Sequence, residues 1–277
     1  MQSLSTKQFD LHHNSLPLSC MIRTLNEASR IGKVLDVVSR LADEIIIVDS
    51  GSTDDTVKIA ESYGATVIHQ PWLGNGFQKR VGEDACRNDW VLDIDADEVL
   101  SDELLASIRK VFSDGLSPVG GYLLKIAFVM PVGAPWLDFS LARRLKLYRK
   151  SVFRSPAHKA WDQPIVPETV KLPTLDGVIL HHSFANLTDL HSKLNRVSTN
   201  RAVEGKPRSL NVLRLRVIFL LPLFFLKNYI LRGMWRAGTY GFAFALSLAY
   251  ARWLRDAKAL EIAMIKECSS DHRNQIL

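Results

Sequence analysis

The hydrophobic positions in the first hundred residues follow two alternating periods. Short apolar or β-branched runs predict four strands, at Leu18–Ile22, Glu44–Val48, Ala65–His69 and Trp90–Ile94. Between them, apolar residues at helical spacing predict three helices, at Arg30–Leu41, Thr56–Tyr63 and Gly76–Arg87. Strands that alternate with helices indicate an α/β fold with a mostly parallel sheet and helices on both faces.

The pattern changes after the fourth strand. Ser101 precedes an apolar periodic run and is a good start for a further helix. Two segments predict strands, at Gly121–Met130 and Arg144–Tyr148, and a Pro-rich stretch follows at Ser155–Asp176. Leu187–Val203 has the pattern of a helix. We therefore expect the second half to be less regular than the first.

The C-terminal part combines apolar and basic side chains. Its longest uncharged runs are Val217–Leu226, of ten residues, and Ala237–Ala251, of fifteen. Both are shorter than the ~20 residues that a spanning helix needs, and Pro222 is expected to break the first one. Two interpretations remain: a pair of buried helices, or an interfacial anchor whose Lys and Arg side chains meet anionic headgroups. Eleven basic residues against two acidic ones in residues 201–260 favour the anchor.

The composition is that of a globular protein. The chain has 277 residues, of which 47% are hydrophobic and 23% charged, and this argues against disorder. We expect an N-terminal tail at residues 1–15, an α/β domain at 16–204 with halves near 16–112 and 113–204, and a helical membrane-associating segment at 205–277. The tail is polar, so we expect no signal peptide. Three cysteines without metal spacing favour a reducing compartment.

The net charge of +6 is unevenly distributed. Residues 201–260 carry a net +9, which leaves −3 for the remainder. The basic residues are interleaved with Leu and Phe rather than set out as a polar stripe, and no nucleic-acid-binding motif is found. We therefore expect an anionic membrane surface as a partner and no nucleic acid.

Polar clusters lie at the carboxyl ends of three predicted strands. They are Thr24–Glu27, Asp49–Thr53 and Asp93–Glu98. In parallel α/β sheets these ends meet at one edge, where ligands bind. The sequence therefore predicts a binding site at this edge.

The third of these clusters is strongly acidic. Asp93, Asp95 and Asp97 alternate along DWVLDIDADEVL, so an extended chain points them the same way, and like charges that close raise one another's pKa. An EF-hand calcium loop is excluded, because Glu98 stands where that loop needs Gly and Leu104 where it needs Glu. A solvated strand end that leads into the next helix remains open. An open divalent-cation site with room for a phosphate is the other interpretation, and the position at the shared edge favours it.

Three motifs in order, SCMIRTLNEA, EIIIVDSGSTDDT and DWVLDIDADE, resemble the family 2 inverting glycosyltransferases, which have the GT-A fold with a Rossmann-like sheet. A narrower resemblance covers most of the chain. PWLGNGFQKR, RLKLYRK and IVPETVKLPTLDGVILHHSF are similar to bacterial glycosyltransferases that extend the lipopolysaccharide inner core, often described as adding β-1,4-glucose to heptose. The resemblance implies a hexosyltransferase with a nucleotide-sugar donor, UDP-glucose first, and a glycolipid or oligosaccharide acceptor.

The resemblance also assigns residues. Asp95 and Asp97 take the two positions of the family's Asp-x-Asp motif, which implies Mg²⁺ or Mn²⁺ held mainly by Asp97, with Asp95 reaching the ion or the ribose. Asp49 is expected to accept a hydrogen bond from the uracil imide. Lys79 and Arg80 are expected to meet phosphate, with a solvated helix face as the alternative. The expected donor-binding residues are Thr24, Asn26, Glu27, Asp49, Ser50, Lys79, Arg80 and Asp95.

Inversion requires a base that takes the proton of the acceptor hydroxyl, and a carboxylate suits this role. We expect Asp162 to be the base, with a turn-forming role as the alternative. The lipopolysaccharide subgroup usually has a His-Asp or His-Glu pair here, but Trp161 stands in place of the His, and His158 is a possible substitute. His181 and His182 are expected in the core or a loop. His181 is also a candidate for phosphate or metal, because the family often has a His nearby.

Two other functions are considered. A nucleotidyltransferase needs a Gly-rich phosphate loop after the first strand, whereas this loop reads RTLNEASRIG. A non-enzymatic membrane-surface scaffold predicts no metal-dependent nucleotide binding. Within the enzyme class, another cell-envelope polysaccharide is the alternative acceptor. Because nucleotide sugars are cytosolic and lipid-linked acceptors are made at the membrane, the resemblance implies a cytoplasmic protein, peripheral on the inner face of the inner membrane.

Overall fold

The computed structural model describes residues 15–132, 141–159 and 161–274, which fall into two compact units. Of the described residues, the α/β unit holds 15–129, 141–159 and 161–183, and the helical unit holds 184–274 together with 130–132. The sequence predicts this boundary after residue 204 instead. The difference arises because helix α5 (Leu187–Val203) packs against the C-terminal helix rather than on the sheet.

The α/β unit is built on one eight-stranded sheet, counted over the described residues, in the order β3-β2-β1-β4-β7-β6-β8-β5. The strands are β1 (Leu16–Thr24), β2 (Ala42–Asp49), β3 (Thr66–His69), β4 (Trp90–Asp95), β5 (Glu98–Leu100), β6 (Gly121–Phe128), β7 (Leu141–Arg149) and β8 (Ile179–His181). The first four strands of this order are parallel, whereas β7 is antiparallel to β4 and β6. Strand β8 is parallel to β6 and antiparallel to β5. The predicted α/β fold is confirmed, and its continuous parallel part is formed by β1 to β4.

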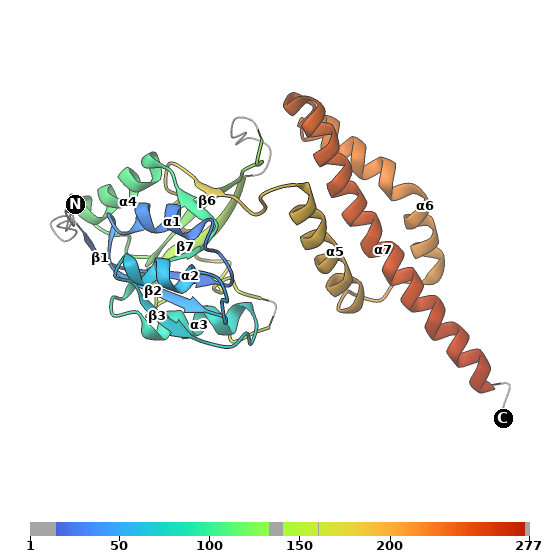
Figure 1. Cartoon of the computed structure of the whole chain (residues 1–277), viewed down its shortest axis with the longest axis horizontal. Helices are drawn as coiled ribbons and strands as arrows, with labels where there is room; N and C mark the ends of the chain where they lie inside the picture. The colour runs from blue at the N-terminus through green and yellow to red at the C-terminus, as the bar shows by residue number, and fades with distance from the viewer. Residues whose placement is uncertain (1–14, 133–140, 160, 275–277) are drawn as a thin grey trace, which may run out of the picture. The chain divides into compact units, whose positions relative to one another are not determined.

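Helices cover both faces of the sheet (Figure 1). Helices α1 (Ile31–Val38), α2 (Thr56–Ser62) and α4 (Asp102–Asp114) share one core with strand residues such as Leu92. On the other face lies α3 (Asn75–Ala85), whose Val81 packs with apolar residues of β1, β2 and β4. Ser101 caps α4 as predicted, because its hydroxyl accepts from Leu104 N at 3.3 Å. This arrangement leaves the carboxyl ends of the parallel strands available for a site.

The helical unit consists of α5 followed by α6 (Leu210–Leu226), a π-helical turn η1 (Lys227–Leu231), a 3₁₀ turn η2 (Met234–Ala237) and the long helix α7 (Gly238–Asn274). Both α5 and α6 pack along α7 (Figure 1). In the part of the chain that the structure describes, no helix has the length and the apolar content needed to cross a membrane.

The prediction that Pro222 breaks its helix is wrong. Helix α6 continues through Pro222 to Leu226, although proline lacks the N–H that a helix interior uses. Packing against α7 offsets this loss, and the carbonyl of Val217 in a preceding turn accepts from Trp253 Nε1 of α7 at 2.9 Å. The regular α-helix ends four residues after the proline, where the π-helical turn begins.

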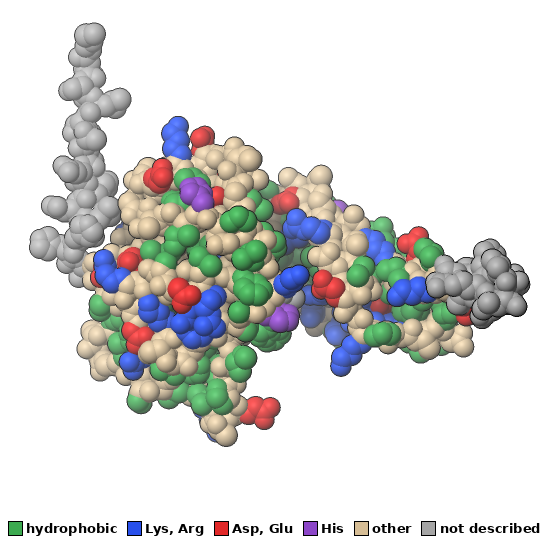
Figure 2. Space-filling view, turned by 90° about the horizontal axis from the view of Figure 1, so that it is seen from below, with side chains coloured by type: hydrophobic (Ala, Val, Ile, Leu, Met, Phe, Trp, Pro, Cys, Tyr) green, Lys and Arg blue, Asp and Glu red, His purple; other side chains and the backbone are tan. Residues whose placement is uncertain are grey.

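The surface of the helical unit mixes apolar and basic side chains. Several large hydrophobic residues of α6 are exposed, among them Ile218 at 66% and Leu223 at 58%. Lys and Arg side chains lie among hydrophobic ones on the face that Figure 2 shows. A helix that exposes several large apolar side chains is suited to contact with a further partner or with an apolar phase.

Candidate active site

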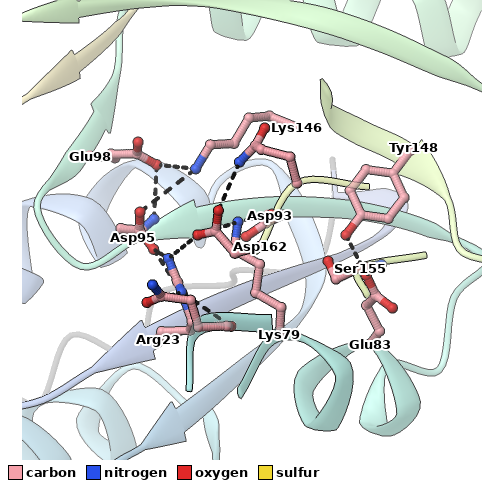
Figure 3. Close-up of polar contacts among 12 residues, drawn as sticks. Arg23, Lys79, Glu83, Asp93, Asp95, Glu98, Lys146, Tyr148, Ser155 and Asp162 are labelled. Carbon is pink, nitrogen blue, oxygen red and sulfur yellow. Dashed lines mark hydrogen bonds and ion pairs between the residues drawn. The ribbon is translucent and has the colours of Figure 1, made fainter. Parts of the chain in front are cut away.

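Strands β1 and β4 place an arginine and an aspartate side by side at their carboxyl ends. The parallel register pairs Arg23 with Asp95. Arg23 donates to Asp95 Oδ1 from Nε at 3.1 Å and from a terminal nitrogen at 2.5 Å (Figure 3). A guanidinium that gives two hydrogen bonds to one carboxylate fixes the position of that carboxylate.

Two lysines pair with the other acids of the motif. Lys79 of α3 lies 2.7 Å from Asp93, and both side chains are only 1% exposed. Lys146 of β7 lies 2.7 Å from Glu98, whose carboxylate also accepts from Asp95 N at 2.9 Å (Figure 3). Buried ion pairs add little net stability, because desolvation offsets their attraction. They do hold the strand-end carboxylates in defined positions.

These cations change the expected electrostatics. Burial alone would raise the pKa of Asp95, but the charges of Arg23, Lys146 and Lys79 lower it well below its usual range. The prediction that neighbouring acids raise one another's pKa is therefore wrong for Asp95. The pKa of Glu98 is raised, first by burial and then by the nearby Asp95, although Lys146 opposes the shift.

Asp97 lies in the turn between β4 and β5, beside a histidine from β8. Glu98 of β5 pairs with His181, and His182 N donates to the Asp97 carbonyl at 2.8 Å. This pairing brings His181 Nε2 to 3.3 Å from Asp97 Oδ2. Burial lowers the pKa of His181, but the hydrogen bond and charge of Asp97, with further help from nearby acids, raise it overall. The candidate histidine thus meets the second Asp of the motif.

The residues present suit a divalent cation that is shared with substrate. Among the described residues, no three His, Cys, Asp or Glu side chains form a closed metal-binding group. Mg²⁺ sites that act on phosphates are commonly built from one or two carboxylates plus the phosphate oxygens. Asp97 and His181 provide such a partial set, whereas Asp95 is engaged by Arg23. The donor set therefore fits an open site rather than a structural one.

Asp162, the predicted base, lies at the same cluster although it comes from a distant loop. Its Oδ2 is 3.3 Å from a terminal nitrogen of Arg23 and 3.6 Å from Lys79 Nζ (Figure 3). The side chain is 26% exposed, whereas Lys79 is buried. Arg23 therefore links Asp162 to Asp95, and the Asp162 carboxylate remains open to solvent on one side.

The loop before Asp162 rests on the first turn of α3. Asn75 N donates to the Lys159 carbonyl at 2.8 Å, and Gly76 N donates to the His158 carbonyl at 3.0 Å. A Cβ at Gly76 would lie 2.1 Å from the Pro156 carbonyl oxygen, so only glycine permits this approach. The sequence GNG in PWLGNGFQKR is thus explained by contact with the loop that leads to Asp162.

Lys79 and Arg80, predicted to meet phosphate, have other partners here. Lys79 is buried in its pair with Asp93, so it does not belong to a solvated helix face. Arg80 donates from Nε to the Ser155 carbonyl at 3.0 Å and supports the same loop. Their contact with phosphate stays a prediction.

A buried glutamate that the sequence did not suggest fastens this loop as well. Glu83 accepts from Tyr148 Oη at 2.7 Å, from Ser155 N at 2.8 Å and from Arg154 Nε at 2.7 Å. Burial first, and then the nearby acids Asp93 and Glu83, raise the pKa of Tyr148 well above its usual value. The phenol therefore stays protonated and keeps donating to Glu83.

The predicted uracil ligand lies in a tight turn. Asp49 is buried, and its carboxylate accepts from Gly51 N and Ser52 N, both at 3.0 Å, and from Thr24 Oγ1 at 3.1 Å. Burial would raise the pKa of Asp49, but the hydrogen bonds, those from Ser52 foremost, lower it. Ser50 Oγ accepts from the Gln78 side chain of α3 at 2.8 Å. These contacts give Asp49 a turn-forming role, and its contact with the base stays a prediction.

Asn26 and Glu27 tie neighbouring loops together. Asn26 has a left-handed backbone with φ of 55°, its N donates to Ser52 Oγ at 2.8 Å, and its side-chain oxygen accepts from Thr53 N at 2.8 Å. Asn tolerates this conformation better than most residues. Glu27 binds Arg30 through both carboxylate oxygens, at 2.7 and 2.9 Å. Arg30 in turn donates to the His182 carbonyl at 3.0 Å, so the first loop reaches the residue that directly follows the candidate His181 at the end of β8.

The comparisons with known proteins define the class. The family described as Glycosyl transferase family 2 matches residues 19–126. The chain is 34% identical over 257 residues to an uncharacterized glycosyltransferase of Rickettsia prowazekii, which covers 89% of this chain and 88% of that protein. It is also 30% identical over 256 residues to the lipopolysaccharide core biosynthesis glycosyltransferase LpsC of Rhizobium meliloti. This match covers 91% of this chain and 94% of LpsC.

These relatives extend over nearly the whole chain, so the protein is a glycosyltransferase with an α/β fold of the GT-A type. The chain belongs to glycosyltransferase family 2. Among solved structures, S. aureus TarS 1-349 matches with a TM-score of 0.46 and 16% identity over 92% of each chain.

Proposed function

We propose that this glycosyltransferase moves a glucosyl group from UDP-glucose to a hydroxyl of the lipopolysaccharide core or of a related glycolipid, with inversion at the anomeric carbon. The name of the Rhizobium meliloti relative supports the class of acceptor. The observation that carries the proposal is the meeting of the Asp-x-Asp turn and the distant Asp162 at one side chain, Arg23.

Asp97 and His181 are the residues that would hold Mg²⁺ or Mn²⁺, together with diphosphate oxygens of the donor. When bound, the ion supplies a Lewis acid that neutralises charge on the departing diphosphate. Asp95, fixed by Arg23, is proposed to orient the ribose or the ion from the neighbouring position. Thr24, Asp49 and their loop partners are proposed to form the nucleoside end of the site.

Asp162 is proposed to act as the base. The acceptor oxygen forms a bond to the anomeric carbon while the bond from that carbon to the diphosphate oxygen breaks and its electron pair leaves with UDP. The proton of the acceptor hydroxyl passes to the Asp162 carboxylate. Arg23 and Lys79 are positioning residues, because they hold this carboxylate within 3.3 and 3.6 Å of their charged nitrogens.

The helical unit is proposed to lie on the anionic cytoplasmic face of the inner membrane. The basic excess of residues 201–260 and the exposed apolar side chains of α6 support this location. Such a location would bring the enzyme to a lipid-linked acceptor.

The test is release of UDP from UDP-glucose by the purified full chain, with a lipopolysaccharide core acceptor and Mn²⁺. We expect transfer that stops when EDTA removes the ion. Release of pyrophosphate instead of UDP would mean nucleotidyl transfer and would overturn the proposal. Transfer only to a different envelope polysaccharide would keep the reaction and replace the acceptor.

A further inference from the structure

An open cavity of about 380 Å³ lies within the helical unit and contains none of the residues discussed as the active site. It forms where the end of α5 and the turn into α6 meet α7. Its lining residues are Arg201, Glu204, Gly205, Lys206, Arg208 and Arg255. Four of the six are basic and one is acidic, so the cavity is strongly positive.

A smaller cavity of about 160 Å³ adjoins this basic cavity, since both are lined by Arg201 and Arg255. It adds a fourth arginine, Arg252, whose Nε is buried and has no hydrogen-bond partner among the described residues. Burial first, and then the nearby Arg255, lower the pKa of Arg252. The other lining residues are mostly apolar, namely Leu194, Val197, Ser198, Leu248 and Ala251.

A single buried acid, Asp256, pairs with three arginines, and its one negative charge cannot neutralise all three. Asp256 is fully buried and lies 2.7 Å from Arg255, 2.9 Å from Arg216 and 3.8 Å from Arg208. One carboxylate therefore faces three guanidinium groups. The Arg255 side chain is only 12% exposed, so its charge is less screened than that of a surface arginine.

The two remaining cations at the rim are unengaged. Within the described part of the chain, the side chains of Arg201 and Lys206 have neither a hydrogen bond nor an ion pair, and Glu204 is the one acid in the lining. Converging cations that repel one another and lack counter-charges are the arrangement that an anion would stabilise.

We propose that this basic cavity binds a phosphate group. Guanidinium forks match the paired oxygens of phosphate, and Asp256 holds two of the lining arginines, Arg208 and Arg255, at this place. The apolar lining of the adjoining cavity gives space for an aliphatic part of the same ligand. A phospholipid headgroup and a soluble phosphate share this chemistry. The proposal goes beyond sugar transfer and does not rest on the proposed function.

The test uses the full chain and two double variants with the same loss of charge. Arg201→Gln with Lys206→Gln removes the two unengaged cations of the basic cavity and leaves the buried Asp256 cluster intact. Arg214→Gln with Lys227→Gln removes two exposed charges of the helical unit outside both cavities and serves as the control. Thermal melts check that both variants are folded.

Calorimetric titration with inorganic pyrophosphate measures a soluble phosphate, and flotation with phosphatidylcholine vesicles, with and without phosphatidylglycerol, measures a lipid phosphate. We expect binding in at least one arm to be weakened roughly tenfold or more beyond the loss seen in the control, because the control loses the same charge but only its general attraction to anionic vesicles. Loss in the pyrophosphate arm assigns a soluble ligand, and loss in the phosphatidylglycerol arm assigns a headgroup. Equal behaviour of the two variants, or no binding of either probe by the unmodified chain, overturns the proposal.

Discussion

Replacing Gly76 by Ala should disrupt the close contact between the first turn of α3 and the loop before Asp162. The new Cβ would lie 2.1 Å from the Pro156 carbonyl oxygen, 2.5 Å from that of Trp161 and 2.9 Å from that of His158. An ordinary contact between carbon and a carbonyl oxygen is about 3.3 Å. All three neighbours are backbone atoms, so no side-chain rotation relieves the clash. The loop must therefore retreat by about 1 Å.

The rate should fall by roughly 10²-fold, because a misplacement of about 1 Å at a reacting group has this effect. The largest loss of rate that a misplaced base can cause is its whole contribution to catalysis, about 10²–10⁴-fold. The hydrogen bond from Gly76 N to His158 should be weakened as well, which lowers the free energy of unfolding by about 1 kcal/mol. The KM for the donor should change little, since among the described residues Thr24 and Asp49 form no hydrogen bond with this loop and instead bond to each other and to the turn at Gly51 and Ser52.

The matched control is Gly32→Ala in α1, where a Cβ would meet nothing within 4 Å. In a helix this change should be neutral or stabilising, by about 0.4–1 kcal/mol. The assay is UDP release at saturating substrates, with a thermal melt of each variant. If Gly76→Ala retains kcat within about twofold while it melts like the unmodified chain, the glycine contact does not position Asp162. An equal loss in Gly32→Ala would show that the effect is not local.

Other expectations follow from the same structure. Asp162→Asn should lower kcat by about 10²–10⁴-fold and leave donor affinity unchanged in calorimetry; unchanged turnover would assign the base to another residue. Asp97→Asn should abolish transfer while the melt is retained, and near-normal activity at limiting Mn²⁺ would exclude Asp97 as a metal ligand. Replacing the exposed Ile218 and Leu223 of α6 by Gln should reduce flotation with anionic vesicles even at high salt, since burial of apolar surface is not screened; equal flotation would exclude α6 as the membrane contact. With the other cysteines changed to Ser, Cys86 should react with iodoacetamide at pH 8 roughly 10³-fold more slowly than in the unfolded chain, because burial raises the pKa of its thiol to about 12.

Regular elements could be predicted where the local pattern agrees with burial. The helix predicted over Leu187–Val203 has those bounds in the structure, and Asn186 caps it by accepting from Asp189 N at 2.9 Å. The β1, β2 and β4 strands were predicted within one or two residues at each end because apolar runs fill a sheet that is covered on both faces.

Two strands could not be predicted. Strands β5 and β8 have three residues each and exist through their mutual pairing and the pairing of β8 with β6. Three residues carry too little periodicity to indicate a strand. This pairing is nevertheless what brings His181 to Asp97, so an essential part of the candidate site depends on contacts that local sequence does not show.

The acidic side of the site could be predicted, but its cations could not. The three polar clusters lie at one sheet edge as expected, because Thr24 and Asp49 are register partners and Asp95 ends the strand on the other side of β1. Lys146 comes from β7, which joins the sheet antiparallel to β4, and the local pattern does not reveal this neighbour. A signal was present in RLKLYR, where a lysine alternates with buried leucines and therefore points to one face of the sheet.

The balance of charges at the carboxyl ends of β1 and β4 suggests a functional reason for the cluster of ionised side chains there. Five carboxylates meet there, Asp93, Asp95, Asp97, Glu98 and Asp162, against three permanent cations, Arg23, Lys79 and Lys146. Pairs of this kind could be replaced by apolar residues with little loss of stability, so stability alone does not account for them. With all five carboxylates ionised and His181 neutral, the excess of two negative charges is balanced by the double positive charge of one Mg²⁺ or Mn²⁺. It lies where the donor diphosphate is proposed to bind. Because the excess is fixed in place before substrate arrives, little reorganisation is needed when a cation and a diphosphate enter, and such preorganisation is the main way in which an active site stabilises developing charge.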